Sequence, residues 1–130
     1  MKKSLLLAAA LVCSGVAQAE TFVCTAEHAT SIANGRTLAV NYSELGIKGF
    51  TYFVDTSRGF RLLVNGIESN FEGECVEALT LTASFNCAYL DGLQYSSLSV
   101  RERGGELRFL QTRIVFGQMA DSTYGKCLRL

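Results

Sequence analysis

Hydrophobic and polar residues alternate along most of this chain, and the alternation is clearest between residues 79 and 89. Every second side chain from Leu79 to Tyr89 is apolar or aromatic, and most of the side chains between them are polar: Thr80, Thr82, Ser84 and Asn86. Successive side chains of a β-strand point to opposite faces, so this period of two predicts a strand with one buried face. We expect residues 79–89 to form the central strand of an antiparallel sheet.

Tight turns are predicted at four pairs of residues that tolerate positive φ angles: Asn34-Gly35, Asn65-Gly66, Asp91-Gly92 and Gly104-Gly105. The segments between these turns carry the same period of two. A first strand begins at Thr21, and residues 29–33 either continue it or form a helical turn. Further strands are expected around residues 38–42, 50–54, 60–64 and 67–71, on both sides of Gly104-Gly105, and at residues 126–130 after a loop at residues 117–124.

Pairing the strands through these turns keeps the large apolar residues on one face. The expected partners are Val54 with Phe60, Phe60 with Phe71, Phe85 with Leu98, and Val100 with Phe109. After Phe109 the apolar positions shift to Leu110, Ile114 and Phe116, which predicts a β-bulge near residues 111–113. The chain is therefore expected to be all-β, an antiparallel meander of about seven or eight strands closed into a small barrel, with a two-layer β-sandwich as the alternative.

The first residues have the features of a signal peptide. Lys2 and Lys3 precede an apolar run at residues 5–12, and Ala17-Gln18-Ala19 matches the small-x-small pattern of a cleavage site. We expect residues 1–19 to be removed and residues 20–130 to form a single β domain. No later segment approaches the roughly 20 apolar residues of a membrane-spanning helix, so no membrane span is expected.

Cleavage after Ala19 also removes Cys13 and leaves four cysteines. An even number of cysteines in an exported chain predicts two disulfides and a periplasmic or extracellular location. Four cysteines allow three pairings. We expect Cys24 to pair with Cys127, which would bring the two ends of the domain together, and Cys75 to pair with Cys87 between neighbouring strands.

Charge and motifs exclude several function classes. Loss of Lys2 and Lys3 leaves ten basic against twelve acidic residues, a balance that gives no support to nucleic-acid binding. The chain has no Cys-x-x-Cys pair and only one histidine, His28, so we expect no metal and no cofactor. No nucleophile motif accompanies His28, and we interpret the acidic cluster of Glu68, Glu72, Glu74 and Glu77 as a solvated corner.

The most suggestive polar residues are arginines. The hairpin through Gly104-Gly105 would bring Arg101, Arg103 and Arg108 together on its polar face, where guanidinium groups could bind a carboxylate, phosphate or sulfate. Arg113 belongs to the same set. A solvated strand face with Glu102 and Glu106 interleaved would have the same sequence. Tyr124, in the expected loop, is a second candidate contact residue.

These observations favour a non-catalytic binding or interaction module, and an inhibitor or an envelope-associated factor would both fit. We expect a monomer whose partner is a protein or an anionic envelope polymer. One alternative is a small-ligand carrier, which requires an internal cavity of at least about 300 Å³. A hydrolase is the third hypothesis, although no residue is a candidate nucleophile.

Overall fold

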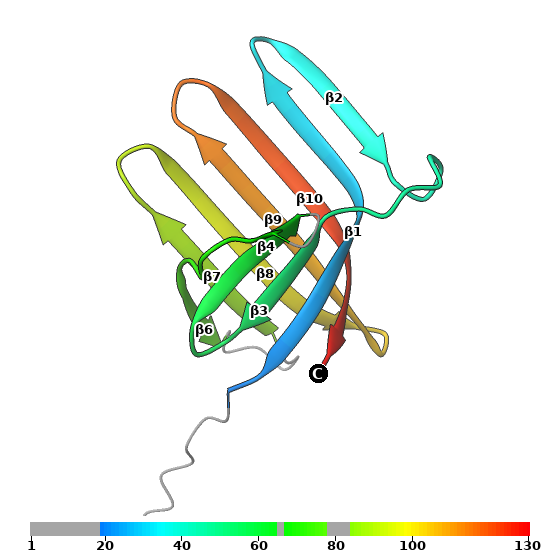
Figure 1. The fold of residues 1–130 in the computed structure, drawn as a ribbon, viewed down its shortest axis with the longest axis vertical. Helices are drawn as coiled ribbons and strands as arrows, with labels where there is room; N and C mark the ends of the chain where they lie inside the picture. Colours follow the sequence, from blue (N-terminus) through cyan, green and yellow to red (C-terminus); the bar gives the residue numbers. More distant parts are fainter. Residues whose placement is uncertain (1–18, 65–66, 78–83) are drawn as a thin grey trace, which may run out of the picture.

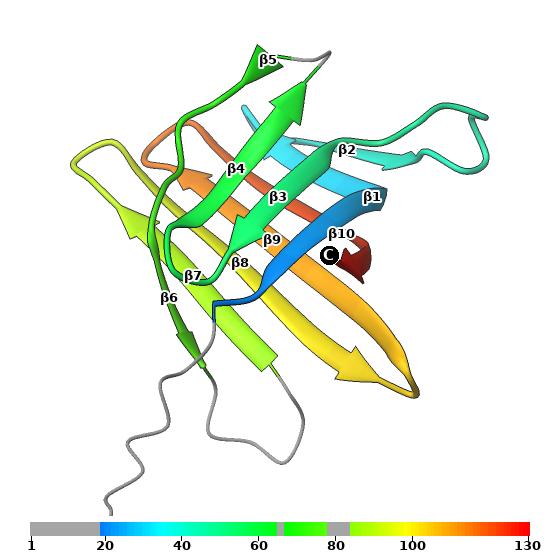
Figure 2. The same ribbon diagram turned by 60° about the horizontal axis from the view of Figure 1, so that its bottom comes forward.

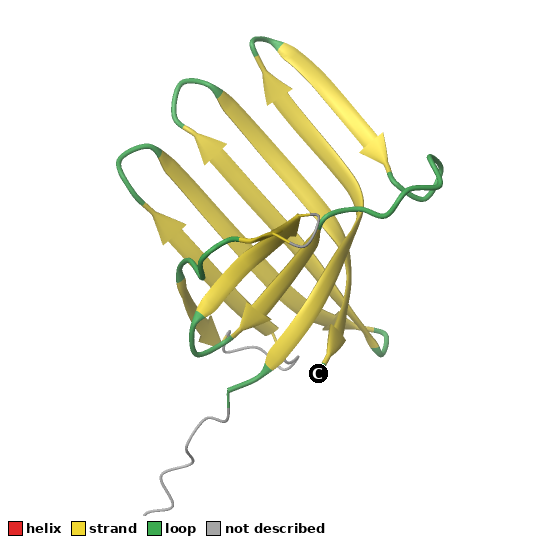
Figure 3. Ribbon diagram, in the orientation of Figure 1, coloured by secondary structure: helices red, strands yellow, loops and turns green. Residues whose placement is uncertain are grey.

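Every regular element of the structure is a β-strand (Figures 1 and 3). It is a computed structural model that describes residues 19–64, 67–77 and 84–130. The ten strands are β1 (Thr21–Ala33), β2 (Arg36–Asn41), β3 (Thr51–Asp55), β4 (Gly59–Val64), β5 (Ile67–Glu68), β6 (Glu74–Glu77), β7 (Ser84–Leu90), β8 (Gln94–Arg103), β9 (Glu106–Val115) and β10 (Met119–Arg129).

All ten strands belong to one antiparallel sheet. Nine of them follow the order β5-β4-β3-β1-β10-β9-β8-β7-β6, and β2 pairs with β1 outside this order. The first and last strands are neighbours, as a Cys24–Cys127 bridge requires. β1 is long enough to have two neighbours on its other side, because Thr21–Thr25 pair with β3 whereas His28–Ala33 pair with β2. Residues 29–33 therefore continue the first strand.

The sheet curls into a half-barrel, with β3 and β4 crossing in front of β7–β10 (Figure 2). The two ends of the strand order, β5 and β6, belong to one stretch of chain. This stretch pairs with β4 through Ile67-Glu68 and Glu72, and with β7 through β6. The hairpins β1–β2, β7–β8 and β9–β10 extend side by side at one end of the half-barrel (Figure 1). A single curled sheet confirms the expected all-β antiparallel architecture. It forms a half-barrel, in place of the fully closed barrel that was expected, and not a two-layer sandwich.

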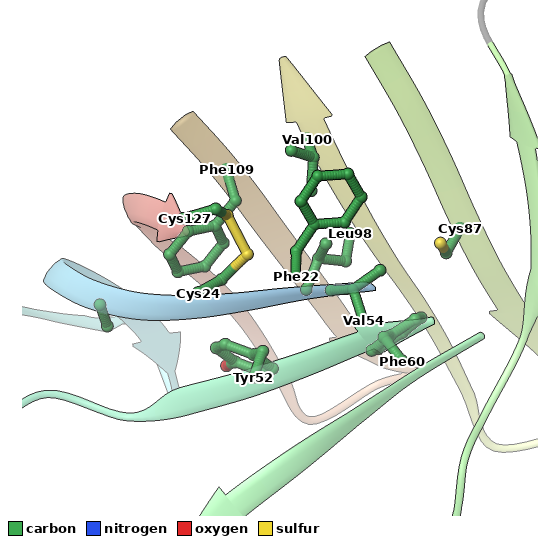
Figure 4. Packing of buried hydrophobic residues seen from close by; sticks show 11 residues of the cluster. Phe22, Cys24, Tyr52, Val54, Phe60, Cys87, Leu98, Val100, Phe109 and Cys127 are labelled. Carbon is green, nitrogen blue, oxygen red and sulfur yellow. A yellow bond between two sulfur atoms is a disulfide. The ribbon is translucent and has the colours of Figure 1, made fainter. Parts of the chain in front are cut away.

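The core fills one part of the half-barrel. Inward-facing side chains from seven strands pack together there, and Phe22, Val54, Leu98 and Val100 are almost completely buried (Figure 4). The disulfides Cys24–Cys127 and Cys75–Cys87 are both confirmed. Each joins two residues that face one another directly in neighbouring strands.

Several predicted strand pairings are confirmed. Val54 faces Phe60, Val100 faces Phe109, and the Gly104-Gly105 turn sets Arg101 opposite Arg108. Phe85, however, faces Val100 and not Leu98. The reason is the turn after β7: the carboxylate of Asp91 accepts hydrogen bonds from the backbone N–H groups of Leu93 and Gln94, and the turn includes residues 91–93. The shift is two residues, so the apolar face is preserved.

A second pairing differs by one residue. Val64 faces Ile67 as expected, but Phe60 pairs with Glu72 and not with Phe71. The extra residue lies between Glu68 and Glu72, where the ladder is interrupted and the Ser69 hydroxyl accepts the Leu62 N–H. Phe71 then packs against the guanidinium groups of Arg58 and Arg61, 4.2 and 4.6 Å from its ring centre.

The predicted bulge at residues 111–113 is wrong. β9 pairs with β8 in one unbroken register, so Gln111 faces inward while Leu110 and Ile114 face outward and are exposed. The bulge lies instead in β1, between Ala26 and His28.

Two strand assignments also change. β7 lies next to the edge strand β6 and is not central, and residues 79–83 of the predicted strand lie outside the described residues. The last strand begins at Met119, so Tyr124 lies on a strand and not in a loop.

Candidate functional site

The concave face of the half-barrel contains a cavity of about 550 Å³. It lies beyond the packed core, toward the end where the hairpins extend. Inward-facing residues of β1, β2 and β8–β10 form one side, and β3, β4 and the segment before β3 form the other. Its apolar walls come mainly from Leu38, Val40, Tyr42, Phe50, Leu62 and Met119.

Buried polar side chains form the boundary between the core and the cavity. Gln111 is only 5% exposed and lies between Ser96 and Thr123, which are equally buried. The Tyr52 hydroxyl donates to the Gln111 carbonyl oxygen at 3.3 Å, and the Gln111 amide donates to the Ser96 hydroxyl at 3.3 Å. Burial raises the pKa of Tyr52, so its phenol stays a neutral donor. Because these buried polar groups are hydrogen-bonded to one another, their burial costs little free energy and their positions are fixed.

Three of the four charged side chains in the cavity wall make ion pairs. Arg113 donates two hydrogen bonds to one carboxylate oxygen of Asp121, and the Ser31 hydroxyl donates to the other at 2.6 Å. The remaining charged lining residues are Arg61, which is paired with Glu68, and Glu72. The lining therefore has two positive and two negative side chains and no net charge.

Sequence reasoning missed this site. The change of apolar phase predicts a bulge at Gln111, and Thr123 falls in the predicted loop. Ser96 shares the alternation of Leu98 and Val100 but is polar, so the pattern alone does not indicate an interior residue there. A signal does exist: counting from the Gly104-Gly105 turn without interruption puts Gln111 on the same face as Phe109. A polar residue at an interior position is itself a reason to suspect a site.

The arginines identified from the sequence lie elsewhere, on the convex face. Arg101, Arg103, Arg108 and Tyr124 line one shallow hollow of about 600 Å³, together with Glu106. They come from β8, β9 and β10. Arg113 is not part of this group, because it faces the concave cavity.

The charged residues of this hollow differ in their ion pairs. Arg108 is paired with Glu27 at 3.1 Å and with Glu106 at 2.9 Å. Hydrogen bonds from Lys126 and Arg108 lower the pKa of Glu106. Within the three described ranges, Arg101 and Arg103 make no ion pair. These two are the side chains of the hollow best able to bind an external anion.

His28 and the acidic cluster do not form sites of their own. The His28 ring stacks on the ring of Tyr124 on the convex face, with centres 4.6 Å apart. Glu68 is paired with Arg61, and Glu74 and Glu77 are exposed. In the described part of the chain, no three His, Cys, Asp or Glu side chains come close enough together to bind a metal ion.

None of the residues that the structure describes forms a helix long and apolar enough to span a membrane. Comparison with protein-family models, curated proteins and solved structures finds no match to this chain.

Proposed function

We propose that this protein is a non-catalytic binding protein that holds an uncharged, mainly apolar group of its ligand in the concave cavity. The observation that carries the proposal is the cavity itself. It has apolar walls, a boundary with the core formed by the hydrogen-bonded side chains of Tyr52, Gln111 and Ser96, and a lining without net charge. Its volume lies within the roughly 300–1,000 Å³ typical of small-molecule sites. Apolar walls supply binding energy through burial, and the few fixed polar atoms orient the ligand.

The location we propose is the periplasm or the extracellular space. Two disulfides are consistent with an oxidising compartment, where such bonds form and persist. The signal-peptide pattern of residues 1–19 agrees with export.

The arrangement of polar groups favours binding over chemistry. The Ser96 hydroxyl accepts a hydrogen bond from the Gln111 amide, which cannot act as a general base. His28 is on the opposite face of the sheet, stacked on Tyr124. Among the described residues of the cavity wall, no hydroxyl and histidine are positioned as a nucleophile and its base.

The first prediction uses two fluorescent probes that differ by one charge. N-phenyl-1-naphthylamine is uncharged, and 8-anilinonaphthalene-1-sulfonate has the same aromatic body with a sulfonate. We expect saturable binding of the uncharged probe and at least about tenfold weaker binding of the sulfonate, because an unpaired charge would have to enter an apolar wall. Fluorescence titration measures both affinities, in a protein with Arg101→Ser and Arg103→Ser so that the arginines of the convex hollow do not bind the sulfonate.

A matched pair of variants on β2 locates the probe. Val40 lines the cavity, whereas the exposed Ala39 faces the convex side. Val40→Glu should weaken binding of the uncharged probe roughly tenfold or more, and Ala39→Glu should leave it unchanged. Equal losses in the two variants, or binding that never saturates, would contradict the proposal.

A second binding function is favoured by the hollow on the convex face, where Arg101, Arg103, Arg108 and Tyr124 lie together. We propose that this hollow binds an anionic group, such as the carboxylate or sulfate of an envelope polymer or of a protein partner. Arg101 and Arg103 would supply the contacts, since Arg108 is already paired with Glu27 and Glu106.

Retention on a heparin column tests this second function. The double variant Arg101→Ser with Arg103→Ser should elute at a lower salt concentration than the double variant Arg36→Ser with Lys48→Ser. The two proteins have the same net charge, so a difference measures a localised site and not the overall charge. Coelution of the two would rule the anion site out.

A further inference from the structure

The free edge of β2 borders the concave cavity. β2 pairs only with β1, and within the described residues no strand lies beyond it. The two strands are joined by the two-residue turn Asn34-Gly35, so the closing pair Ala33 and Arg36 exchanges both hydrogen bonds, and unbonded pairs alternate with bonded ones along the hairpin. Thr37 and Ala39 belong to the unbonded pairs. Their N–H and C=O groups therefore point away from β1 and are available to another strand.

This edge lacks the features that usually prevent edge-to-edge pairing. Proteins protect such edges with proline, lysine, bulges or inward-pointing charges. β2 reads Arg-Thr-Leu-Ala-Val-Asn, its register with β1 is unbroken over all six residues, and its only charge is at its first residue.

The inward side chains of the same strand form part of the cavity wall. Leu38 and Val40 both line the cavity, and Leu38 is 65% exposed although it faces the concave side. A strand added beside β2 would lie about 4.8 Å away, with every second side chain on this same face. Backbone pairing and a side-chain pocket would then be adjacent, which is the arrangement used in β-strand addition.

We propose that the ligand of the cavity is an extended peptide segment of a partner protein, which adds to β2 as a further strand and places an uncharged apolar side chain in the cavity. This inference rests on the proposed binding function of the same cavity. The side chain is uncharged because the cavity lining has no net charge, and its Arg113 and Asp121 are already paired with one another. A second copy of the chain pairing at the same edge is the alternative that the sedimentation measurement below tests.

The experiment uses one synthetic peptide and one backbone variant. The peptide acetyl-Lys-Thr-Leu-Thr-Leu-Thr-Lys-amide alternates apolar and polar residues, and its control has glutamate at both leucine positions. Ala39→Pro removes one outward-pointing N–H group at a position where an edge strand tolerates proline. Thr37→Pro does the same one pair along, and it serves if the first variant does not fold.

We expect the leucine peptide to displace N-phenyl-1-naphthylamine from the wild-type protein and the glutamate peptide not to displace it. The proline variant should bind the probe with unchanged affinity and the leucine peptide roughly tenfold more weakly or worse. Val40→Glu should lose binding of both the probe and the leucine peptide, which distinguishes the role of the cavity from that of the strand edge.

Two results would overturn the inference. If the probe binds but the leucine peptide does not displace it, or displaces it equally well from the proline variant, the ligand is not a paired strand. The proposed function of the cavity would still stand. If sedimentation shows concentration-dependent dimers that the proline variant abolishes, the edge is occupied by a second copy. Failure of the probe itself to bind would contradict the proposed function instead.

Discussion

Replacing Cys24 and Cys127 together by alanine is expected to lower the free energy of unfolding by about 4.7 kcal/mol, a large part of the roughly 5–15 kcal/mol typical of a single domain. The two residues are 103 positions apart, and the bridge closes nearly the whole domain into one loop. In the chain-entropy model, such a closure removes many conformations from the unfolded state. The bridge also joins β1 to β10, the pair that brings the two ends of the chain into one sheet.

The second disulfide supplies the control. Cys75 and Cys87 are only 12 positions apart, so their replacement by alanine should cost about 3 kcal/mol on the same reasoning. Urea unfolding followed by tyrosine fluorescence or circular dichroism measures both losses, since the chain has no tryptophan. If replacing Cys75 and Cys87 lowered the free energy of unfolding more than replacing Cys24 and Cys127, loop closure would not be the main source of the stability that the two disulfides provide.

The overall fold could be predicted from the sequence because strand periodicity and turn residues are local signals. A two-residue turn such as Gly104-Gly105 sets the register of its two strands directly, so Arg101 and Arg108 could be placed face to face without a structure. Four cysteines allow three pairings, and the expectation that Cys24 pairs with Cys127 rested on placing the first and last strands side by side; the structure confirms it.

Registers that depend on side chains could not be predicted in the same way. Asp91-Gly92 has the residue types of a two-residue turn, but the Asp91 carboxylate accepts two backbone hydrogen bonds and stabilises a longer one. Phe85 consequently shifts by two positions along β8. The sequence between Asp91 and Gln94 is compatible with both turn lengths, and the residue types alone do not select between them.

The cavity could not be predicted from the hydrophobic pattern, for a related reason. A polar residue at an interior position and a one-residue bulge produce the same change of phase, and at Gln111 the bulge is the wrong interpretation. The cavity also depends on where the core stops. Whether the interior beyond Phe109 and Leu98 is filled is decided by how β3 and β4 cross the sheet, which no local pattern reports.

The convex hollow could be predicted in part. Arg101, Arg103 and Arg108 are expected together because they share one hairpin. The sequence indicates Tyr124 only as a loop residue, and it reaches the same hollow because β10 pairs with β9, which puts Tyr124 opposite Leu110. The partial neutralisation of Arg108 by Glu27 is a long-range contact, and the sequence contains no indication of it.

The substitution Gly125→Ala is expected to lower the free energy of unfolding by about 3 kcal/mol, the upper part of the range for overpacked sites. Gly125 is buried in β10 opposite Ala26, where β1 bulges between Ala26 and His28. An added Cβ atom would overlap the carbonyl oxygen of Thr25 and lie 2.9 Å from the backbone nitrogen of Glu27. Both obstacles are backbone atoms, so no side-chain rotation can relieve the overlap and the two strands must separate.

Gly92→Ala is the matched control for this prediction. Gly92 is exposed at the tip of the β7–β8 hairpin, and an added Cβ atom there would have no heavy atom within 4 Å. We expect its free energy of unfolding to stay within about 0.5 kcal/mol of the wild-type value. The losses from Gly125→Ala and from the Cys24–Cys127 replacement should fall short of additive, because both act on the β1–β10 pair within a few residues of one another. If the Gly125→Ala protein proved as stable as the Gly92→Ala protein, the backbone of β1 would not lie as close to Gly125 of β10 as the structure places it.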